Sequence, residues 1–480
     1  FRLKFEELFF LQLELLHRKQ ISFEKGSGFV FPKLSKVFNT FYADHLPFDL
    51  TDAQKRVIKE IRKDVTSGKH MNRLLQGDVG SGKTFVALLA ALMAIDNDFQ
   101  AAIIAPTEIL ATQHYEGISE MLAPLGVKVG MLKGSVRKKQ REVLHEQLRS
   151  GEMHLLIGTH ALLENEVRFQ NLGLVVIDEQ HRFGVAQRAK MWRKNVVPPH
   201  VLIMTATPIP RTLAMTFYGD LDVSVIDELP PGRKPITTSH RYETNRIAVF
   251  KFMKQEIALG RQIYIVYPLI KESETLDLNN LMDGFEAISR SFPLPDYKVS
   301  IVHGQMKADA KQFEMDRFVK GETNIMVATT VIEVGVNVPN ASVMIIENAE
   351  RFGLSQLHQL RGRVGRGADK SYCILMSSYK ISKEAKKRIE TMVRTQDGFE
   401  IAEVDLEIRG PGDIMGTQQS GDLNLKLADL ATDGVLIGIA RDAARDLLRK
   451  DEKLQWAENG LTREKLNRIL RSRPDWGKIS

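Results

Sequence analysis

The sequence predicts an α/β protein with two tandem parallel-sheet lobes, followed by a helical hairpin, a glycine-rich loop and a helical tail. From Leu46 onward, short apolar runs alternate with helical stretches, a pattern typical of parallel sheets that carry helices on both faces. The segment 230–235, PPGRKP, interrupts this alternation and indicates a domain boundary. The alternation then resumes, and it stops after Ser377. The architecture therefore repeats once along the chain.

Composition places the chain among ordinary globular proteins. Its 480 residues leave room for about three domains and for more than one buried core. Hydrophobic residues make up 43% and charged residues 26%, which excludes disordered, collagen-like and disulfide-scaffold proteins. The one cysteine, Cys373, permits no intrachain disulfide and favours a reducing compartment. A net charge of +7 gives a weak indication of an anionic partner.

The beginning of the chain predicts a helix that docks onto another segment. Leu8, Leu11 and Leu15 recur at helical spacing within residues 1–19. Residues 20–45 are rich in aromatic side chains and predict an irregular linker.

Neither a leader nor a membrane span is expected within these residues. The chain begins with Phe1 and has no signal-peptide pattern, so we expect it to be part of a longer protein. The longest apolar run, Phe85–Ile95, has 11 residues, whereas a spanning helix needs ~18.

Each lobe has its own set of predicted strands. Those of the first lobe are Ala101–Ala105, Leu155–Gly158, Leu172–Ile177 and Val201–Thr205. Those of the second are Gln262–Tyr267, Val299–Val302, Ile325–Ala328, Val343–Ile346 and Tyr372–Met376. Residues 271–295 carry acidic side chains and two late prolines, which predicts a surface insertion.

These patterns together predict five ranges. They are 1–45 for the N-terminal helix and linker, 46–232 for the first lobe, 233–378 for the second lobe, 379–425 for the hairpin and loop, and 426–480 for the tail.

The segment 77–84, GDVGSGKT, is the most informative in the sequence. It matches G-x-x-x-x-G-K-[ST] in full, follows an apolar run and precedes a helical pattern. Its glycines let backbone N–H groups surround phosphate oxygens at the positive end of a helix, although a tight strand–helix turn is the alternative. We therefore expect ATP and Mg²⁺, with Lys83 at the β- and γ-phosphates and Thr84 on the metal. The expected nucleotide-binding residues are Gly77, Asp78, Val79, Gly80, Ser81, Gly82, Lys83 and Thr84.

Two carboxylates follow the apolar run 174–177. We expect Asp178 to bind Mg²⁺ and Glu179 to position and deprotonate the attacking water. Alone, this pair would fit a solvated strand end better. The phosphate-loop pattern upstream favours the catalytic interpretation.

Three arginines lie within the segment 359–366, QLRGRVGR. A basic surface turn is one interpretation. The other is an arginine finger, in which Arg363 and Arg366 stabilise charge on the transferring phosphoryl group from the second lobe. Hydrolysis would then depend on closure of the cleft. The residues alone leave both interpretations open.

Taken together and in this order, these segments resemble the motif set of superfamily two helicases and translocases. The resemblance covers nearly all of residues 46–376 and implies two RecA-like lobes. Phe48, Thr51 and Gln54 resemble the Q motif, which reads adenine. The resemblance assigns nucleic-acid contact or coupling to Pro106, Thr107, Gln113, Thr205, Thr207, Thr329 and Thr330.

Three segments are more specifically similar to the RecG family of bacterial DNA translocases. They are DEQHRFGV at 178–185, TPIPRTL at 207–213 and RGPGD at 409–413. The resemblance implies an ATP-dependent double-stranded DNA translocase and helicase of the 3′–5′ class. Such an enzyme remodels stalled replication forks and recombination junctions by branch migration and fork regression, in DNA repair and recombination.

The same resemblance implies partners and a location. They are branched or forked double-stranded DNA and single-stranded DNA-binding protein, with no membrane partner. We expect a monomer in the bacterial cytoplasm, associated with the nucleoid. No segment resembles the wedge domain of the family, so junction preference is not assigned to these residues. Asn337 stands where many relatives carry Asp, and it lacks that charge.

The loop Arg409–Gly421, RGPGDIMGTQQSG, resembles the translocation motif of the RecG family and follows a helical pattern near 386–394. Its four glycines and one proline predict an irregular backbone path. We assign Arg409, Gln418 and Gln419 to coupling or to DNA contact. The alternative is a surface loop that only completes the fold.

Other functions remain open from the sequence. A transcription–repair coupling translocase shares the lobes and a related loop, whereas an RNA helicase would usually carry a different second motif. A nucleotide-gated binding module would show ATP turnover that DNA does not change. Four basic residues could follow DNA phosphates, although a solvated helix face is favoured. They are Arg137, Lys138, Lys139 and Arg141.

Overall fold

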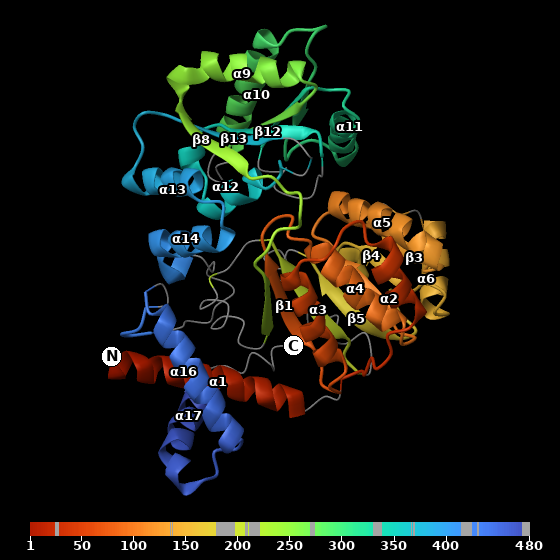
Figure 1. The fold of residues 1–480 in the computed structure, drawn as a ribbon, viewed down its shortest axis with the longest axis vertical. Coiled ribbons are helices and arrows are strands. Elements are labelled where there is room, and N and C mark those ends of the chain that lie inside the picture. Colours follow the sequence, from red (N-terminus) through yellow and green to blue (C-terminus); the bar gives the residue numbers. More distant parts are fainter. Residues whose placement is uncertain are drawn as a thin grey trace. The chain divides into compact units, whose positions relative to one another are not determined.

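The computed structural model of the chain contains two compact units. The first comprises Phe1–Gly77, Gly82–Glu228 and Arg409–Ser480, and the second Asp78–Ser81 and Leu229–Ile408. Each unit is built on a parallel sheet, which confirms the predicted fold class (Figure 1). The structure describes residues 1–24, 28–134, 136, 138–178, 197–206, 210, 221–268, 274–329, 338–365, 367, 370–413, 425–429 and 432–472.

The sheet of the first unit has seven described strands in the order β3-β4-β2-β5-β6-β1-β7. Its central strands are buried on both faces: Leu74 and Leu75, neighbours on β1, pack into two different apolar clusters. The strands are β1 (Asn72–Gly77), β2 (Gln100–Ile104), β3 (Val129–Leu132), β4 (Leu155–Gly158), β5 (Leu172–Ile177), β6 (His200–Thr205) and β7 (Asp222–Ile226). The four strands predicted from the sequence are confirmed to within one residue, and β1, β3 and β7 are additions to them.

Helices cover this sheet and supply a large part of one of its two apolar clusters. Nearly every residue of the apolar helix α4 (Lys83–Ile95) is buried against the strands and α3. A capping box formed by Thr51 and Gln54 begins α3. The helices of this part are α2 (Lys36–Thr40), the π-helical turn η1 (Phe41–His45), α3 (Asp52–Val65), α4, α5 (Glu108–Leu122) and α6 (Lys138–Arg149), with short 3₁₀ turns at Ala123–Leu125 and His160–Leu163.

The prediction of an irregular linker over residues 20–45 is wrong. Helix α1 extends to Glu24, and Phe31, Phe38 and Phe41 are buried in the core of the first unit. The Asp96 carboxylate, at the end of α4, accepts hydrogen bonds from the backbone N–H of Ser35, Val37 and Phe38. The aromatic residues therefore mark core packing rather than a spacer.

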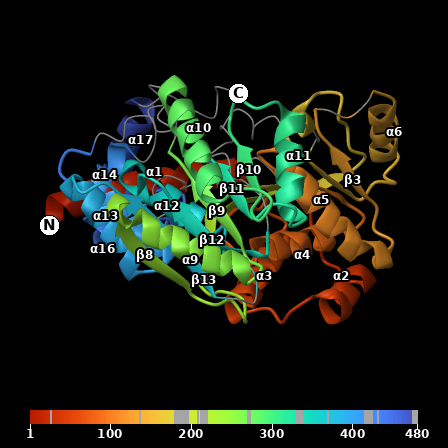
Figure 2. The same cartoon turned by 90° about the horizontal axis from the view of Figure 1, so that it is seen from above.

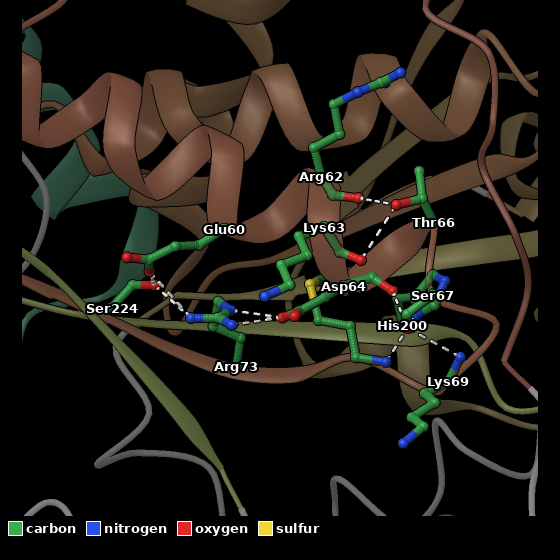
Figure 3. Close-up of polar contacts among 11 residues, drawn as sticks. Glu60, Arg62, Lys63, Asp64, Thr66, Ser67, Lys69, Arg73, His200 and Ser224 are labelled. Atoms are coloured by element: carbon green, nitrogen blue, oxygen red, sulfur yellow. Dashed lines mark hydrogen bonds and ion pairs between the residues drawn. The ribbon is translucent and has the colours of Figure 1, made fainter.

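A buried arginine ties three elements together at the start of β1. Arg73 is 8% exposed and donates to Asp64 on α3 (Nε–Oδ2, 2.8 Å) and to Ser224 on β7 (NH1–Oγ, 2.7 Å) (Figure 3). Glu60, one helical turn before Asp64, accepts from the same guanidinium at 3.2 Å and also from the Ser224 hydroxyl. The buried cation is thus paired with two carboxylates, as its burial requires.

The N-terminal helix packs against the end of the chain. Helix α1 (Arg2–Glu24) crosses α16 (Gly434–Lys450) and contacts α17 (Gly460–Ser472), which follows the short turn Ala457–Asn459 (Figure 1). Leu13, Ala444 and Leu466 share their apolar core. This arrangement confirms the expectation that the first helix docks onto another segment.

Polar contacts fix the first turns of α1. The Glu7 carboxylate accepts hydrogen bonds from the backbone N–H groups of Lys426 (2.5 Å), Leu427 (3.0 Å) and Ala428 (2.9 Å). Lys4 pairs with Asp433, the residue that precedes α16, at 2.8 Å. The chain segment before α16 is therefore held by α1.

The second unit has six described strands in the order β10-β11-β9-β12-β13-β8. Helices α9 and α10 lie on one face of this sheet and α12 and α13 on the other, and Figure 2 shows the first pair from above (Figures 1 and 2). The strands are β8 (Ile236–Tyr242), β9 (Gln262–Val266), β10 (Val299–Val302), β11 (Ile325–Ala328), β12 (Ala341–Ile346) and β13 (Ser371–Ser377). The helices are α9 (Arg246–Ala258), α10 (Glu274–Ser291), α11 (Ala308–Val319), α12 (Leu354–Arg361), α13 (Lys383–Arg394) and α14 (Gly398–Asp413), with 3₁₀ turns at Glu243–Asn245 and Ala349–Arg351.

The prediction of a surface insertion over residues 271–295 is wrong. Most of that segment is α10, which lies between β9 and β10 in the chain, and Leu281, Ile288 and Phe292 are buried in the core of the second unit. Parallel strands need a crossover of a dozen or more residues, usually a helix. The acidic residues belong to that crossover helix.

The prediction of an irregular backbone from Arg409 onward is also partly wrong. Helix α14 continues through Arg409 and ends at Asp413, so its last turn includes two glycines and a proline. Burial of Ile401, Ala402 and Leu406 stabilises the helix upstream. Glycine and proline both weaken a helix, and Pro411 lacks the N–H that would bond the carbonyl four residues earlier, so these residues suit the end of α14 and not its interior.

Of the residues that the structure describes, none forms a helix both long and apolar enough to cross a membrane.

Candidate nucleotide-binding site

Three neighbouring strands of the first sheet end beside one another with the chemistry expected for a nucleotide site. Strands β5, β6 and β1 are adjacent and parallel, and they end at Ile177, Thr205 and Gly77. The phosphate loop follows β1 and Asp178 follows β5, so both leave the same edge of the sheet. In open parallel sheets, this carboxyl edge is where ligands bind.

The phosphate loop leads into α4 through glycine. Gly82 precedes the helix with φ +83°, a left-handed conformation that only glycine adopts cheaply. Lys83, the first residue of α4, is 8% exposed, and its Nζ donates to the Gly77 carbonyl at 2.7 Å. Thr84 follows it in the first turn. The positive end of a buried helix thus carries the lysine and the hydroxyl that the sequence pattern requires.

Asp178 lies directly after β5 and is 8% exposed. Its backbone N–H donates to the carbonyl of Ile104 on β2 at 2.9 Å. Its Oδ2 accepts from Nε2 of His114, on α5, at 3.1 Å. The acidic side chain is therefore held by a neighbouring helix.

The donor chemistry around this edge fits Mg²⁺. Thr84 and Asp178 offer a hydroxyl and a carboxylate, the hard oxygen ligands that Mg²⁺ prefers. In the described part of the chain, no cluster of three or more His, Cys, Asp or Glu side chains could hold a metal. One hydroxyl and one carboxylate suit an ion that takes its other ligands from phosphates and water.

The residues that resemble the Q motif lie against the core of the first unit. The Phe48 ring contacts Phe85 on α4, edge to face, with 4.7 Å between ring centroids. Gln54 is fully buried, and its Oε1 accepts from the Thr51 N–H at 2.9 Å. The glutamine that the resemblance assigns to adenine therefore also closes the cap of α3.

Asp78, Val79, Gly80 and Ser81 belong to the second unit. There, Oδ1 of Asp78 lies 2.6 Å from Nε2 of His358, on α12. The Val79 carbonyl accepts from the Arg233 guanidinium. Burial lowers the pKa of Arg233, and the Asp78 carboxylate acts in the opposite direction.

The segment of three arginines begins at the end of α12. Arg361 is buried and donates to the carbonyls of Met392 (3.0 Å) and Thr395 (2.8 Å), at the end of α13. Arg363 lies in the turn that follows, with its N–H bonded to the Leu360 carbonyl at 3.0 Å. Arg361 thus has a structural role at the hairpin, and the finger roles of Arg363 and Arg366 stay predictions.

The residues assigned to nucleic acid lie at ends of strands and helices. Pro106 and Thr107 follow β2, and the Thr107 hydroxyl accepts from the Leu110 N–H at 3.3 Å to cap α5, which also carries Gln113. Thr205 and Thr329 are buried, at the end of β6 and just after β11. Arg409 is exposed on α14.

Several predicted residues lie outside the described residues, and their roles stay predictions. They are Glu179, Thr207, Thr330, Asn337, Arg366, Gln418, Gln419 and Arg137. Of the other basic candidates on α6, Lys138 and Lys139 are exposed, and Arg141 pairs with Glu164 at 2.5 Å.

Sequence reasoning missed His114, His358 and Arg361 as structural partners of the predicted site. A lone histidine carries no spacing signal, so only the fold brings His114 to Asp178. His358 and Arg361 do lie in or beside the QLRGRVGR segment. Their position in or beside this segment was the signal in the sequence that could have identified them.

Family comparisons cover most of the chain. Residues 51–216 match the DEAD/DEAH box helicase family, and residues 248–368 match the helicase conserved C-terminal domain. Residues 395–480 match the C-terminal part of domain 3 of the ATP-dependent DNA helicase RecG.

A solved structure of RecG bound to a three-way DNA junction is similar to the chain, with TM-score 0.74 and 43% identity over 91% of this chain and 56% of that one. A structure of yeast Dbp5 bound to RNA and ADP BeF3, 17% identical with TM-score 0.54, covers 79% of this chain and 98% of that one and shares the fold alone.

Individual relatives agree over nearly the whole chain. The ATP-dependent DNA helicase RecG of Synechocystis is 49% identical over 454 residues, which are 95% of this chain and 54% of that protein. The RecG of Bacillus subtilis is 46% identical over 465 residues, which are 97% of this chain and 68% of that protein. The chain thus spans from about half to two thirds of the length of these relatives. It belongs to the RecG family of ATP-dependent DNA helicases.

Proposed function

We propose that the chain is an ATP-driven double-stranded DNA translocase that remodels forked and branched DNA. One observation carries the proposal most directly: the phosphate loop and Asp178 leave the same edge of the first sheet, on strands separated only by β6. Lys83 would neutralise the β- and γ-phosphates, and Asp178 and Thr84 would hold Mg²⁺. When bound, Mg²⁺ would supply charge neutralisation for the transferring phosphoryl group.

Water activation and the second lobe complete the proposed reaction. Glu179 would orient and deprotonate the attacking water, since it follows Asp178 directly. Arg363 and Arg366 would stabilise the charge that develops in the transition state. Replacement of either arginine by alanine should then lower turnover far more than ATP affinity. A parallel collapse of affinity would make them ground-state ligands.

The domain ranges and partners belong to this proposal. Two RecA-like lobes at 46–232 and 233–378 would move relative to each other during turnover, and 379–425 would transmit that motion to DNA. Forked DNA is the proposed substrate because a junction-bound RecG is similar over 91% of this chain. The protein would act as a monomer in the bacterial cytoplasm and would also contact single-stranded DNA-binding protein.

Coupling is the part of the proposal that Arg409 tests. This exposed side chain lies in the last turn of α14, next to the segment that carries Gln418 and Gln419. The Arg409→Ala variant should retain much of its DNA-stimulated ATPase but fail to move junctions. Measuring both activities on one preparation decides it, because equal loss of both, or of neither, contradicts a coupling role.

ATP turnover measured without nucleic acid, with forked DNA and with RNA tests the whole function. Strong stimulation by forked DNA and none by RNA supports the translocase. Stimulation by RNA would indicate an RNA helicase instead. Turnover that no nucleic acid changes would indicate a nucleotide-gated binding module.

A further inference from the structure

A histidine outside the recognised motifs contacts the acidic residue of the nucleotide site. Nε2 of His114 lies 3.1 Å from Oδ2 of Asp178, and each side chain is only 11% exposed. A carboxylate accepts hydrogen bonds, so Nε2 carries the hydrogen and donates. The contact is sheltered from water, and a sheltered hydrogen bond to a charged group is stronger than an exposed one.

A second connection links the same two elements through the backbone. Strands β2 and β5 are paired, with Ile104 opposite Ile177, and the Asp178 N–H donates to the Ile104 carbonyl at 2.9 Å. From Ile104 the chain passes into Pro106, Thr107 and then α5. Asp178 is therefore bonded through its backbone to Ile104, at the end of β2, and through its side chain to His114 on α5.

We propose that His114 is a positioning residue that orients the Asp178 carboxylate toward Mg²⁺ and links α5 to the metal site. This role rests on the proposed ATPase. With Oδ2 held by the imidazole, Oδ1 would be the oxygen left to bind the cation. Hydrogen bonds of this kind fix the direction of a ligating oxygen, and their removal typically costs 10- to 100-fold in metal affinity or activity.

The contact between His114 and Asp178 also links a helix assigned to nucleic-acid contact with the metal site. Gln113, assigned to nucleic acid by resemblance, is the chain neighbour of His114 on α5. His114 lies on α5, whereas Asp178 follows a strand of the sheet. A displacement of α5 relative to the sheet on DNA binding would therefore change the distance between His114 Nε2 and Asp178 Oδ2. His114 then contributes to the stimulation of ATP turnover by DNA as well as to Mg²⁺ affinity.

Two substitutions test the proposal. His114→Ala removes the donor, whereas His114→Gln keeps an N–H group of similar reach. We expect the Mg²⁺ concentration at half-saturation to rise about 10-fold or more in His114→Ala and less in His114→Gln. This value is measured in two ways: from ATP turnover and from binding of a fluorescent, non-hydrolysable ATP analogue. Stimulation by forked DNA should fall in the same order.

Control variants separate this role from a general loss of structure and from failure of the ATPase proposal. His160→Ala removes an exposed histidine of the same unit and should match the wild type. If His114→Ala does not fold, His114→Gln carries the test alone. Unchanged Mg²⁺ dependence and unchanged DNA stimulation in the folded variants overturn the positioning role. Turnover retained in Lys83→Ala would instead overturn the ATPase proposal, and analogue binding still tests His114 in that case.

Discussion

The Lys83 ammonium donates a hydrogen bond to the Gly77 carbonyl, with 2.7 Å between Nζ and O. Gly77 ends β1 and Lys83 begins α4, so this bond joins the two ends of the phosphate loop. A phosphate oxygen carries more charge than a carbonyl oxygen and is the stronger partner for an ammonium group. Bound ATP is therefore expected to take over this donor.

We predict that Lys83→Ala lowers ATP turnover by roughly 10²-fold or more, because phosphoryl transfer relies on positioned charge. Steady-state turnover with saturating forked DNA measures the effect. Lys55→Ala, which removes an exposed lysine of α3, is the matched control and should leave turnover unchanged. Near-normal turnover in Lys83→Ala would contradict the assignment of the phosphate loop.

The network around Arg73 gives a prediction about stability. Arg73→Met removes a 9% exposed guanidinium and leaves Asp64 and Glu60 without their cation (Figure 3). We expect the first unit to lose about 2–3 kcal/mol, below the range for fully buried pairs, because both carboxylates are partly exposed. Chemical denaturation followed by a probe in the first unit measures the loss.

Arg56→Met provides the comparison for Arg73. Arg56 pairs with Asp227 at 2.8 Å, and both side chains are at least 40% exposed. An exposed pair contributes at most about 1 kcal/mol. Equal destabilisation by the two substitutions would show that burial of the Arg73 network is not what stabilises β1.

The sheets could be predicted from the sequence because central parallel strands read as short apolar runs. The bounds of β5 and β11 follow from such runs alone. Edge strand β8, ITTSHRY, is largely polar and carries no such signal. Helix α10 was missed because acidic residues separate its buried side chains, such as Leu281 and Ile288.

The candidate site was predictable only where its residues are neighbours in sequence. The phosphate loop and Asp178 each form a local pattern. The contact between His114 and Asp178 spans 64 positions, and that between Arg73 and Ser224 spans 151. Only the order of the strands brings such residues together, and a single sequence does not give that order.

A buried histidine predicts how stability depends on pH. His200, at the start of β6, accepts from the Met71 N–H at 2.9 Å, and its Nε2 donates to the Phe29 carbonyl at 2.9 Å. Burial lowers the pKa of His200 from 6.5 to about 4, and the nearby His70 adds to the effect. Between these values the unfolded chain binds a proton that the folded chain does not.

The free energy of unfolding should therefore fall as the pH is lowered from 6.5 toward 4, by up to about 3 kcal/mol from His200. It should change little from this source above pH 6.5. In His200→Gln, this part of the pH dependence should disappear, whereas His160→Gln should retain it. Denaturation curves at several pH values measure the slope, and an unchanged slope in His200→Gln would contradict the assignment.

The contact of Glu7 with the segment before α16 gives the last prediction. Three backbone N–H groups donate to this carboxylate and lower the pKa of Glu7, although burial acts in the opposite direction. In Glu7→Gln, an NH₂ group replaces one acceptor oxygen, most readily Oε1, which accepts from Lys426 alone, so that N–H loses its acceptor, at a cost of about 0.5–1.5 kcal/mol for these largely exposed bonds. The amide of Lys426, and to a lesser degree those of Leu427 and Ala428, should then exchange with solvent faster, which hydrogen-exchange measurements detect directly. Glu6→Gln alters the neighbouring surface pair with Lys465 and should leave these amides protected. Protection retained in Glu7→Gln would mean that the packing of α1 on α16, rather than the carboxylate, holds this segment in place.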